Sequence, residues 1–203
     1  MEFQYAAGAT PLDADETEGL APSHITTQGD LNAWEQANIL QGAKWAALQS
    51  ARWAARQKKL DLLDEGFVRT LHHRMFDQTW KWAGRFRQSN KNIGVDWAQV
   101  SVKLRNLLDN TRYQIENQIY AADEIAVRFH HQLVWIHAFP TGNGRHARLM
   151  ADLLVMQLGR ARLTWGGDAA PLASVGVMRG RYLAALRAAD QGNFAGLIAF
   201  ARS

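Results

Sequence analysis

Apolar side chains recur at the spacing of an α-helix through most of this chain. The first such run covers residues 31–57, and Asp30 is placed to cap its N-terminus. Its apolar face comprises Trp34, Ile39, Trp45, Leu48 and Trp53. The same period predicts further helices over residues 64–79, 100–120, 122–136, 143–158, 177–189 and 194–201. No internal repeat of fixed length accompanies them, so the sequence predicts a mainly α architecture.

Two stretches depart from this period. Residues 86–97 have short alternating character around Gly94 and predict a small β-hairpin, the only strand pair that the sequence supports. Residues 1–29 contain several glycines and prolines with little periodicity, which is typical of an extended arm that lies on a domain or is partly disordered. We therefore expect an N-terminal arm over residues 1–29 and one helical domain over residues 30–203.

Composition narrows the class of protein. Hydrophobic residues make up 47% and charged residues 21% of the chain, as in ordinary soluble globular proteins. The absence of cysteine excludes disulfides, thiol nucleophiles and cysteine-ligated metal sites. The N-terminus lacks a basic start and an apolar run, and no later stretch stays apolar long enough to cross a bilayer. We therefore expect a cytoplasmic protein without a membrane partner.

The net charge of +4 is unevenly distributed, because four acidic residues crowd positions 13–18 and leave the remainder more basic. Acidic small molecules are therefore suitable ligands. No run of lysine and arginine is interleaved with aromatic residues, so we expect no nucleic acid partner. A zinc hydrolase is not expected either, since no His-x-x-x-His spacing and no companion ligand accompany His130, His131, His137 and His146.

The candidate chemistry lies in a glycine-rich loop, residues 139–144, between two predicted helices. Gly142 and Gly144 let the backbone turn sharply and approach a ligand closely. The helix that follows offers free N–H groups and the positive end of its dipole, which suit a phosphate. Arg145 and Arg148 are three residues apart and can neutralise separate oxygens of one ligand. The loop therefore predicts a polyphosphate site.

His137 ends the helix before this loop, where its ring could reach over bound phosphates. An imidazole that titrates near neutrality can take the proton of an incoming hydroxyl, as a transfer to Ser, Thr or Tyr requires. A glycine turn, a terminal histidine and an arginine pair each have ordinary structural explanations when taken alone. Their joint spacing indicates a phosphate-transfer site.

Fic proteins share the signature HxFx(D/E)GNGRxxR, which resembles His137-x-Phe139-x-x-Gly142-Asn143-Gly144-Arg145-x-x-Arg148 here. The resemblance extends to both sides of this signature. The family's early helix is similar to residues 71–76, the entry to its flap to residues 82–85, and its last long helix to residues 181–187. Residues 23–27 and 34–38 make the whole chain most similar to the branch called mobile mystery protein B. The resemblance implies a Fic-type helical bundle with a small β-hairpin flap.

The resemblance also implies adenylylation, in which ATP gives its AMP to a Ser, Thr or Tyr hydroxyl of a target protein and Mg2+ bridges the phosphates. His137 would be the general base, and Phe139 would anchor the loop in the core. The phosphates would be bound by Gly142, Asn143, Gly144, Arg145 and Arg148. The flap that aligns the target by main-chain pairing would comprise Asn92, Ile93, Gly94 and Val95.

Thr141 departs from the family signature, in which an acidic residue that holds the metal precedes the first glycine. A hydroxyl is a weaker ligand, although it can serve Mg2+ when phosphates supply most of the charge. The chain could thus be an attenuated enzyme or, alternatively, a silent nucleotide- or phosphopeptide-binding module, and removal of AMP from a target is a third possibility. Gly144 stands where phosphoryl-transferring members carry lysine, which favours AMP transfer.

Glu35 is a candidate inhibitory residue, because many Fic proteins carry a helix whose Ser/Thr-x-x-x-Glu-Gly/Asn motif sends a glutamate to the second arginine of the loop. Leu31 and Gln36 do not fit that motif, yet a Glu35–Arg148 ion pair is physically reasonable. The alternative is an exposed glutamate on an amphipathic helix. Family members in mobile elements also act in toxin–antitoxin pairs, which adds a small antitoxin-like protein to the expected partners.

Overall fold

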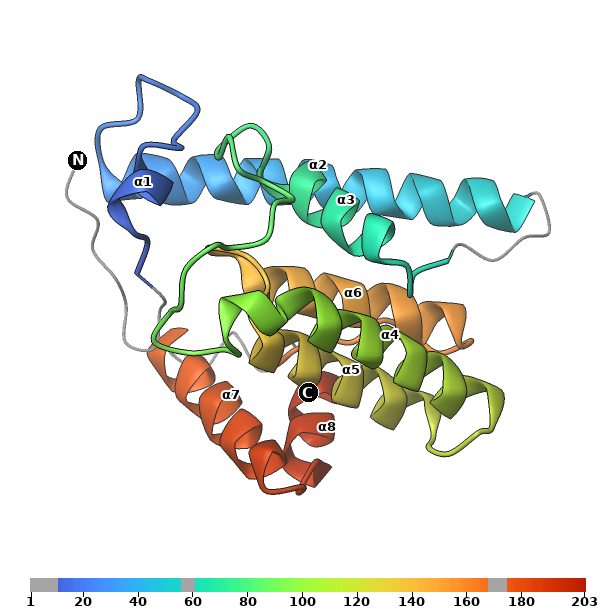
Figure 1. The fold of residues 1–203 in the computed structure, drawn as a ribbon. Coiled ribbons are helices and arrows are strands. Elements are labelled where there is room, and N and C mark those ends of the chain that lie inside the picture. The colour runs from blue at the N-terminus through green and yellow to red at the C-terminus, as the bar shows by residue number, and fades with distance from the viewer. Residues whose placement is uncertain (1–10, 56–60, 168–174) are drawn as a thin grey trace.

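A computed structural model describes residues 11–55, 61–167 and 175–203 as helices joined by loops (Figure 1). The helices are α1 (Ala14–Thr17), α2 (Gln28–Ala55), α3 (Glu65–Phe76), α4 (Val100–Glu116), α5 (Ala122–Ile136), α6 (Asn143–Gln157), α7 (Val175–Asp190) and α8 (Ala195–Arg202), with a 3-10 turn, η1 (Trp97–Gln99), before α4. None of the described helices is long and apolar enough to span a membrane.

Figure 1 shows how the helices pack against one another. α2, the longest helix, packs along α3 on one side of the molecule. α4, α5 and α6 pack beneath that pair, and α7 and α8 pair with one another at the opposite end, where α8 contacts α5. α3 also contacts α6. The turn that joins α5 to α6 therefore lies against the C-terminal part of α3.

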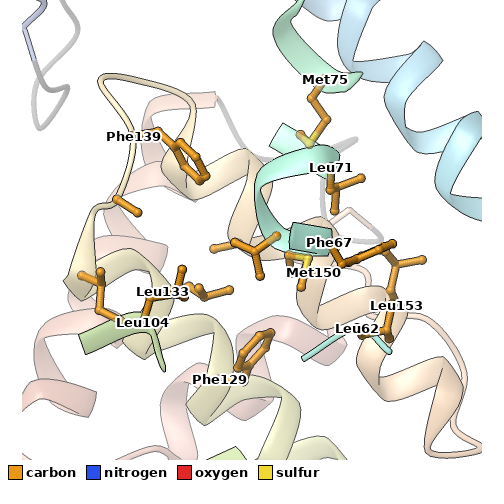
Figure 2. Packing of buried hydrophobic residues seen from close by; sticks show 14 of the residues in the cluster. Leu62, Phe67, Leu71, Met75, Leu104, Phe129, Leu133, Phe139, Met150 and Leu153 are labelled. Carbon is orange, nitrogen blue, oxygen red and sulfur yellow. The ribbon is translucent and has the colours of Figure 1, made fainter. Parts of the chain in front are cut away.

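The main core lies where α3, α4, α5 and α6 meet (Figure 2). α3 contributes Phe67, Leu71 and Met75 to one cluster, to which α5 adds Phe129 and α6 adds Met150. Burying such a side chain fully contributes about 1.5–3 kcal/mol relative to leaving it exposed. A second cluster joins α5 and α6 to the C-terminal helices and comprises Ala126, Val127, Ala151, Val155, Leu163, Ala185, Ala189, Leu197 and Ala201.

The mainly α prediction is confirmed, with changes at the helix ends. α2 begins at Gln28 because Thr27, and not Asp30, stands at its N-terminus. The Thr27 Oγ1 accepts a hydrogen bond from the Asp30 N–H at 3.1 Å. The last two residues of the predicted helix, 56 and 57, lie outside the described residues.

Two other helices end earlier than their apolar pattern predicts. α3 ends at Phe76, because the chain turns there and the Thr79 N–H donates to the Phe76 carbonyl at 3.0 Å. α4 ends at Glu116, two residues before Gln118, which has a left-handed backbone with φ 51°. Apolar residues continue past both ends, so hydrophobic period alone does not mark them.

The predicted β-hairpin is wrong, because residues 86–96 form an irregular loop and no strand occurs in the part of the chain that the structure describes. We call this segment the flap loop. The carbonyls of Ser89 and Val95, near its two ends, accept hydrogen bonds from the Arg87 guanidinium. A hairpin would need such carbonyls to face a neighbouring strand. The buried Arg87 therefore occupies carbonyl groups that a hairpin would use to bond one strand to the other.

The described part of the N-terminal segment, residues 11–27, lies on the turn that follows α3. Leu20 forms an isolated antiparallel bridge with Trp80, and the Ala21 N–H donates to the Thr79 carbonyl at 2.8 Å. The short helix α1 lies just before this bridge. The division into an arm over residues 1–29 and one domain over residues 30–203 stays a prediction.

Candidate functional site

The turn between α5 and α6 begins in an uncommon backbone conformation. His137 has φ 53° and ψ 58°, in the left-handed region, which costs a non-glycine residue about 1–2 kcal/mol. This conformation reverses the chain and buries the ring, which is only 6% exposed. Burial lowers the pKa of His137 to about 4, and the nearby charges of Arg87 and Lys91 act in the same direction.

Asn143 closes the turn by bonding twice to one residue. Its Oδ1 accepts from the Phe139 N–H at 2.9 Å, and its Nδ2 donates to the Phe139 carbonyl at 2.7 Å. The side-chain amide of Asn143 is therefore used within the loop, and only its backbone N–H is placed at the start of α6 for a ligand. Phe139 is buried in the core, as the sequence suggests.

His72 of α3 joins the turn to the segment that leads into the flap loop. Its Nδ1 accepts from the Gly84 N–H at 3.0 Å, so its Nε2 carries the proton and donates to the Thr141 carbonyl at 3.1 Å. The ring also stacks on Phe139 with centroids 3.7 Å apart. Burial, and then the nearby His146, hold the pKa of His72 well below its usual value. This histidine is thus a neutral link.

The two glycines of the turn have different roles. Gly142 has φ 77°, and a Cβ there would lie 2.4 Å from Cζ of Phe76. Gly144 stands in the first turn of α6, where a Cβ would meet no atom within 4 Å. Gly142 is thus needed to form the turn, whereas Gly144 leaves open space beside the first N–H groups of α6.

Replacing Gly142 by alanine is expected to lower the free energy of unfolding by about 2–4 kcal/mol, because it adds a left-handed alanine and a clash with Phe76. Gly144→Ala is the matched control, since its new methyl group enters open space and alanine favours the helix. Urea denaturation of both variants measures the difference. Equal stabilities would contradict the role given to Gly142.

Arg145 is held by α2. Its Nη2 lies 2.9 Å from Oε2 of Glu35, and its guanidinium lies over the Phe76 ring, 5.1 Å from the centroid. Glu35 Oε1 also accepts from the Trp80 indole N–H at 2.8 Å. The predicted pairing of Glu35 with Arg148 is therefore wrong. The alternative of an exposed glutamate is wrong as well, since Glu35 is 7% exposed.

Arg148 faces the other way, toward α7. Its guanidinium lies over the Tyr182 ring, 5.5 Å from the centroid, and the Tyr182 hydroxyl bonds to Nε2 of His130 at 2.9 Å. Burial lowers the pKa of Arg148 and raises that of Tyr182 to about 12. In this structure the two arginines of the signature thus contact different helices, although both project from the first turns of α6.

The flap loop covers His137. A Cβ on Gly94, whose φ is 101°, would lie 2.6 Å from the Cβ of His137. The buried Arg87 donates through Nε to the His137 carbonyl at 2.6 Å and through Nη2 to the carbonyl of Val95. Ile93 is 44% exposed at the tip. The residues predicted as a flap therefore lie beside the predicted base, and Arg87 bonds both to their loop and to the backbone of that base.

Three residues that shape this site carry no role in the sequence-based prediction, namely His72, Arg87 and Tyr182. His72 lies in a segment already similar to the family's early helix, and Arg87 lies two residues after the flap entry at residues 82–85. A polar residue inside an otherwise apolar stripe could have drawn notice to His72. Nothing in the local pattern separates Arg87 or Tyr182 from surface residues of the same types.

Comparisons with known proteins concern the region that contains this site and the fold as a whole. The model of the Fic/DOC family matches residues 62–155, which include α3, the flap loop and the α5–α6 turn. No curated protein matches the chain. Among solved structures, Fic-1 from C. elegans is 21% identical with a TM-score of 0.66, and the match covers 94% of this chain and 54% of that one. The chain thus spans about half the length of that relative.

Two bacterial structures match over more of their own length. The N-terminal Fic domain of a putative cell filamentation protein from Bartonella quintana, with bound ADP, is 18% identical, with a TM-score of 0.62 and coverage of 89% and 86%. BepC from Bartonella tribocorum, with bound AMPPNP, is 15% identical, with a TM-score of 0.60 and coverage of 94% and 97%. Such identities establish a shared fold. Residues 62–155 of this chain match the Fic/DOC family model, and the described residues have an all-helical, Fic-like fold.

Proposed function

We propose that this protein is an adenylyltransferase that moves AMP from ATP to a Ser, Thr or Tyr hydroxyl of a target protein. The observation that carries the proposal is a buried histidine at the entrance of a closed turn, directly before the open N-terminus of α6. ADP and AMPPNP are bound in two proteins of the same fold, which supports a nucleotide as the ligand.

His137 is the general base of this proposal. Its low pKa leaves the imidazole neutral near pH 7, so a ring nitrogen can accept the proton of the target hydroxyl. The hydroxyl oxygen forms a bond to the α-phosphorus, the bond between that phosphorus and the bridging oxygen breaks, and pyrophosphate leaves. The left-handed backbone of His137 and the Arg87 hydrogen bond to its carbonyl support a fixed ring position.

The phosphates bind at the start of α6 in this proposal. Backbone N–H groups of Gly142, Asn143 and Gly144 and the positive end of the helix dipole attract the anion. The open space beside Gly144 supports close approach of a ligand. Arg145 and Arg148 add positive charge, although Arg145 must first give up its contact with Glu35 to reach a phosphate.

Mg2+ fits this site only in part. Thr141 offers a neutral hydroxyl where the family signature has an acid, and the neighbouring carboxylate of Glu35 already binds Arg145 and Trp80. When the ion is bound, it neutralises phosphate charge, and most of its ligands would be phosphate oxygens and water. The same features favour the second candidate, a weak or silent nucleotide-binding module. Removal of AMP from a target would use the same site and is the third candidate.

The exposed flap loop presents the target segment. Asn92, Ile93, Gly94 and Val95 would pair with the target main chain and place its hydroxyl beside His137, and the close approach of Gly94 to His137 supports this role. The mobile mystery protein B branch, a small antitoxin-like partner and a cytoplasmic location complete the proposal. The branch and the partner rest on the resemblance of the sequence, and the location rests on the amino-acid composition of the chain.

Labelled ATP tests the proposal. Purified protein is incubated with Mg2+ and with ATP labelled at the α or at the γ phosphate, beside a Thr141→Asp variant, and the protein is separated on a gel. Transfer of α label with release of pyrophosphate is expected, and more of it in Thr141→Asp. Transfer of γ label would mean phosphoryl transfer. A silent wild-type protein that binds ATP and is activated by Thr141→Asp would identify the binding module.

Glu35→Gly is expected to raise self-modification about tenfold or more, the change that corresponds to losing a charge-assisted contact of about 1.5–3 kcal/mol. The variant frees Arg145 for a phosphate by removing its carboxylate partner. Gln36→Gly is the control, because Gln36 is the exposed neighbour on the same helix and the substitution adds the same backbone flexibility. Incorporation of α label measures both rates, and an unchanged Glu35→Gly rate would exclude inhibition.

A further inference from the structure

α1, together with its N-cap residue Asp13, binds the flap loop through two carboxylates. The charged side chain of Lys91 is buried, with only 2% of its surface exposed. Its Nζ donates to Oδ2 of Asp13 at 2.7 Å and to Oε2 of Glu16. The Ser89 hydroxyl donates to the same Asp13 oxygen. Two carboxylates of the N-terminal segment thus bind two polar residues of the flap loop, Ser89 and Lys91.

These carboxylates are themselves held in place. The Trp82 indole N–H donates to the Glu16 carbonyl at 2.9 Å, and the Lys81 N–H donates to the Gly19 carbonyl at 2.8 Å. A Cβ on Gly19 would lie 2.4 Å from the Trp82 ring, so the backbone lies directly on that indole. The Asp13 N–H also bonds to Glu16 Oε2 at 2.8 Å. α1 is therefore a fixed support for the loop.

We propose that α1 is a positioning element of the active site, in which Asp13 and Glu16 hold Lys91 so that residues 92–95 stay over His137. The proposal rests on the proposed function, because the loop is the segment that would present the target. Asp13 and Glu16 touch no reacting group and act through Lys91. Arg87 holds the inner side of the same loop by hydrogen bonds to the backbone of the loop and of His137.

Neutralising the two carboxylates should release the loop. A buried ammonium without a counter-charge is strongly unfavourable, so Lys91 would leave its site for water and draw its neighbours outward. The variant Asp13→Asn with Glu16→Gln keeps the size of both side chains. Its matched control is Asp15→Asn with Glu18→Gln, which removes two charges from exposed positions of the same segment.

Hydrogen exchange of the intact protein gives the first result. In the Asp13→Asn, Glu16→Gln variant the amides of residues 89–95 should exchange at least tenfold faster, while the α5 and α6 amides keep their wild-type rates. The control should match the wild type throughout. Unchanged exchange of residues 89–95 in the first variant would overturn the proposal.

The His137 imidazole gives a second result, followed by NMR as pH is varied. Opening of the loop exposes the ring, so its pKa should rise from about 4 toward the ordinary value. Loss of two negative charges would by itself lower that pKa, so a rise reports the departure of Lys91, whose charge lowers it, together with exposure of the ring. A rise only in the Asp13→Asn, Glu16→Gln variant supports positioning over His137, and a value equal to that of the control would contradict it.

Both measurements are made without ATP or target, so they separate this proposal from the proposed function. If the wild-type protein transfers no AMP, the proposed function fails while exchange and titration still decide whether α1 positions the loop. If it does transfer AMP, the Asp13→Asn, Glu16→Gln variant should lose at least tenfold in rate at saturating ATP with the KM for ATP unchanged. A raised KM for ATP with an unchanged rate would contradict a role in presenting the hydroxyl.

Discussion

Replacing His137 by alanine is expected to lower the rate of AMP transfer by about 10²- to 10⁴-fold, the contribution of a positioned general base. The phosphate groups would still meet the N-terminus of α6, so the Kd for ATP should change little. Label incorporation from α-labelled ATP measures the rate, and calorimetric titration measures the Kd. His24→Ala, at an exposed position of the N-terminal segment, is the control and should keep the wild-type rate.

Two outcomes would contradict this role. An His137→Ala variant that keeps the wild-type rate would show that another group accepts the proton. A variant that loses ATP binding together with activity would show that the ring shapes the phosphate site instead. Because the pKa of His137 is about 4, the wild-type rate should also stay level from about pH 5 upward with respect to this group.

Acidification is expected to unfold the protein well before its carboxylates are protonated. Burial lowers the pKa of His137 and His146 to about 4 and of His130 to about 3, and His72 is shifted in the same direction. In the unfolded chain these groups titrate near pH 6.5. The unfolded state therefore binds more protons below that pH, and stability present above it is lost as pH falls toward 4.

Each such histidine contributes a loss of about 1.4 kcal/mol per pH unit across this window. Urea denaturation at a series of pH values from 7.5 to 4.5 measures the slope, an interval chosen around the ordinary pKa of about 6.5. His146→Gln can keep a donor for the Val68 carbonyl without titrating. It should therefore reduce the slope of stability against pH by the contribution of one histidine, up to about 1.4 kcal/mol per pH unit. A stability that does not change between these pH values would contradict the neutral state of the buried histidines.

The fold was predictable where one physical signal dominated. Apolar period locates the helices, because each buries one face against a neighbour. The α5–α6 turn was predictable as well, since Gly142 needs a conformation that other residues rarely adopt. The flap loop was not. Its alternating pattern fits a strand. The local sequence does not reveal that the Arg87 guanidinium bonds to backbone carbonyls that would otherwise accept hydrogen bonds from a neighbouring strand.

The sequence predicted which residues belong to the site better than it predicted which of them contact one another. The sequence indicates Glu35 and two arginines, yet which arginine Glu35 meets depends on where α2 places Glu35 relative to the start of α6. That placement depends on long-range contacts, including the hydrogen bond between Trp80 and Glu35. The same holds for His72, whose two ring nitrogens bond to segments 12 and 69 residues away.

The bonds that shape the α5–α6 turn are uncharged, because neutral His72 holds Thr141 and the Asn143 amide holds Phe139. The contacts that reach the site from outside are ionic, between Glu35 and Arg145 and between α1 and Lys91. Dissolved salt screens an ion pair more strongly the more its charges are exposed, and it leaves neutral hydrogen bonds nearly unchanged. The molecule thus combines a turn whose shape does not depend on ionic strength with outer contacts that respond to it only through their exposed members, Asp13 at 45% and Arg145 at 34%.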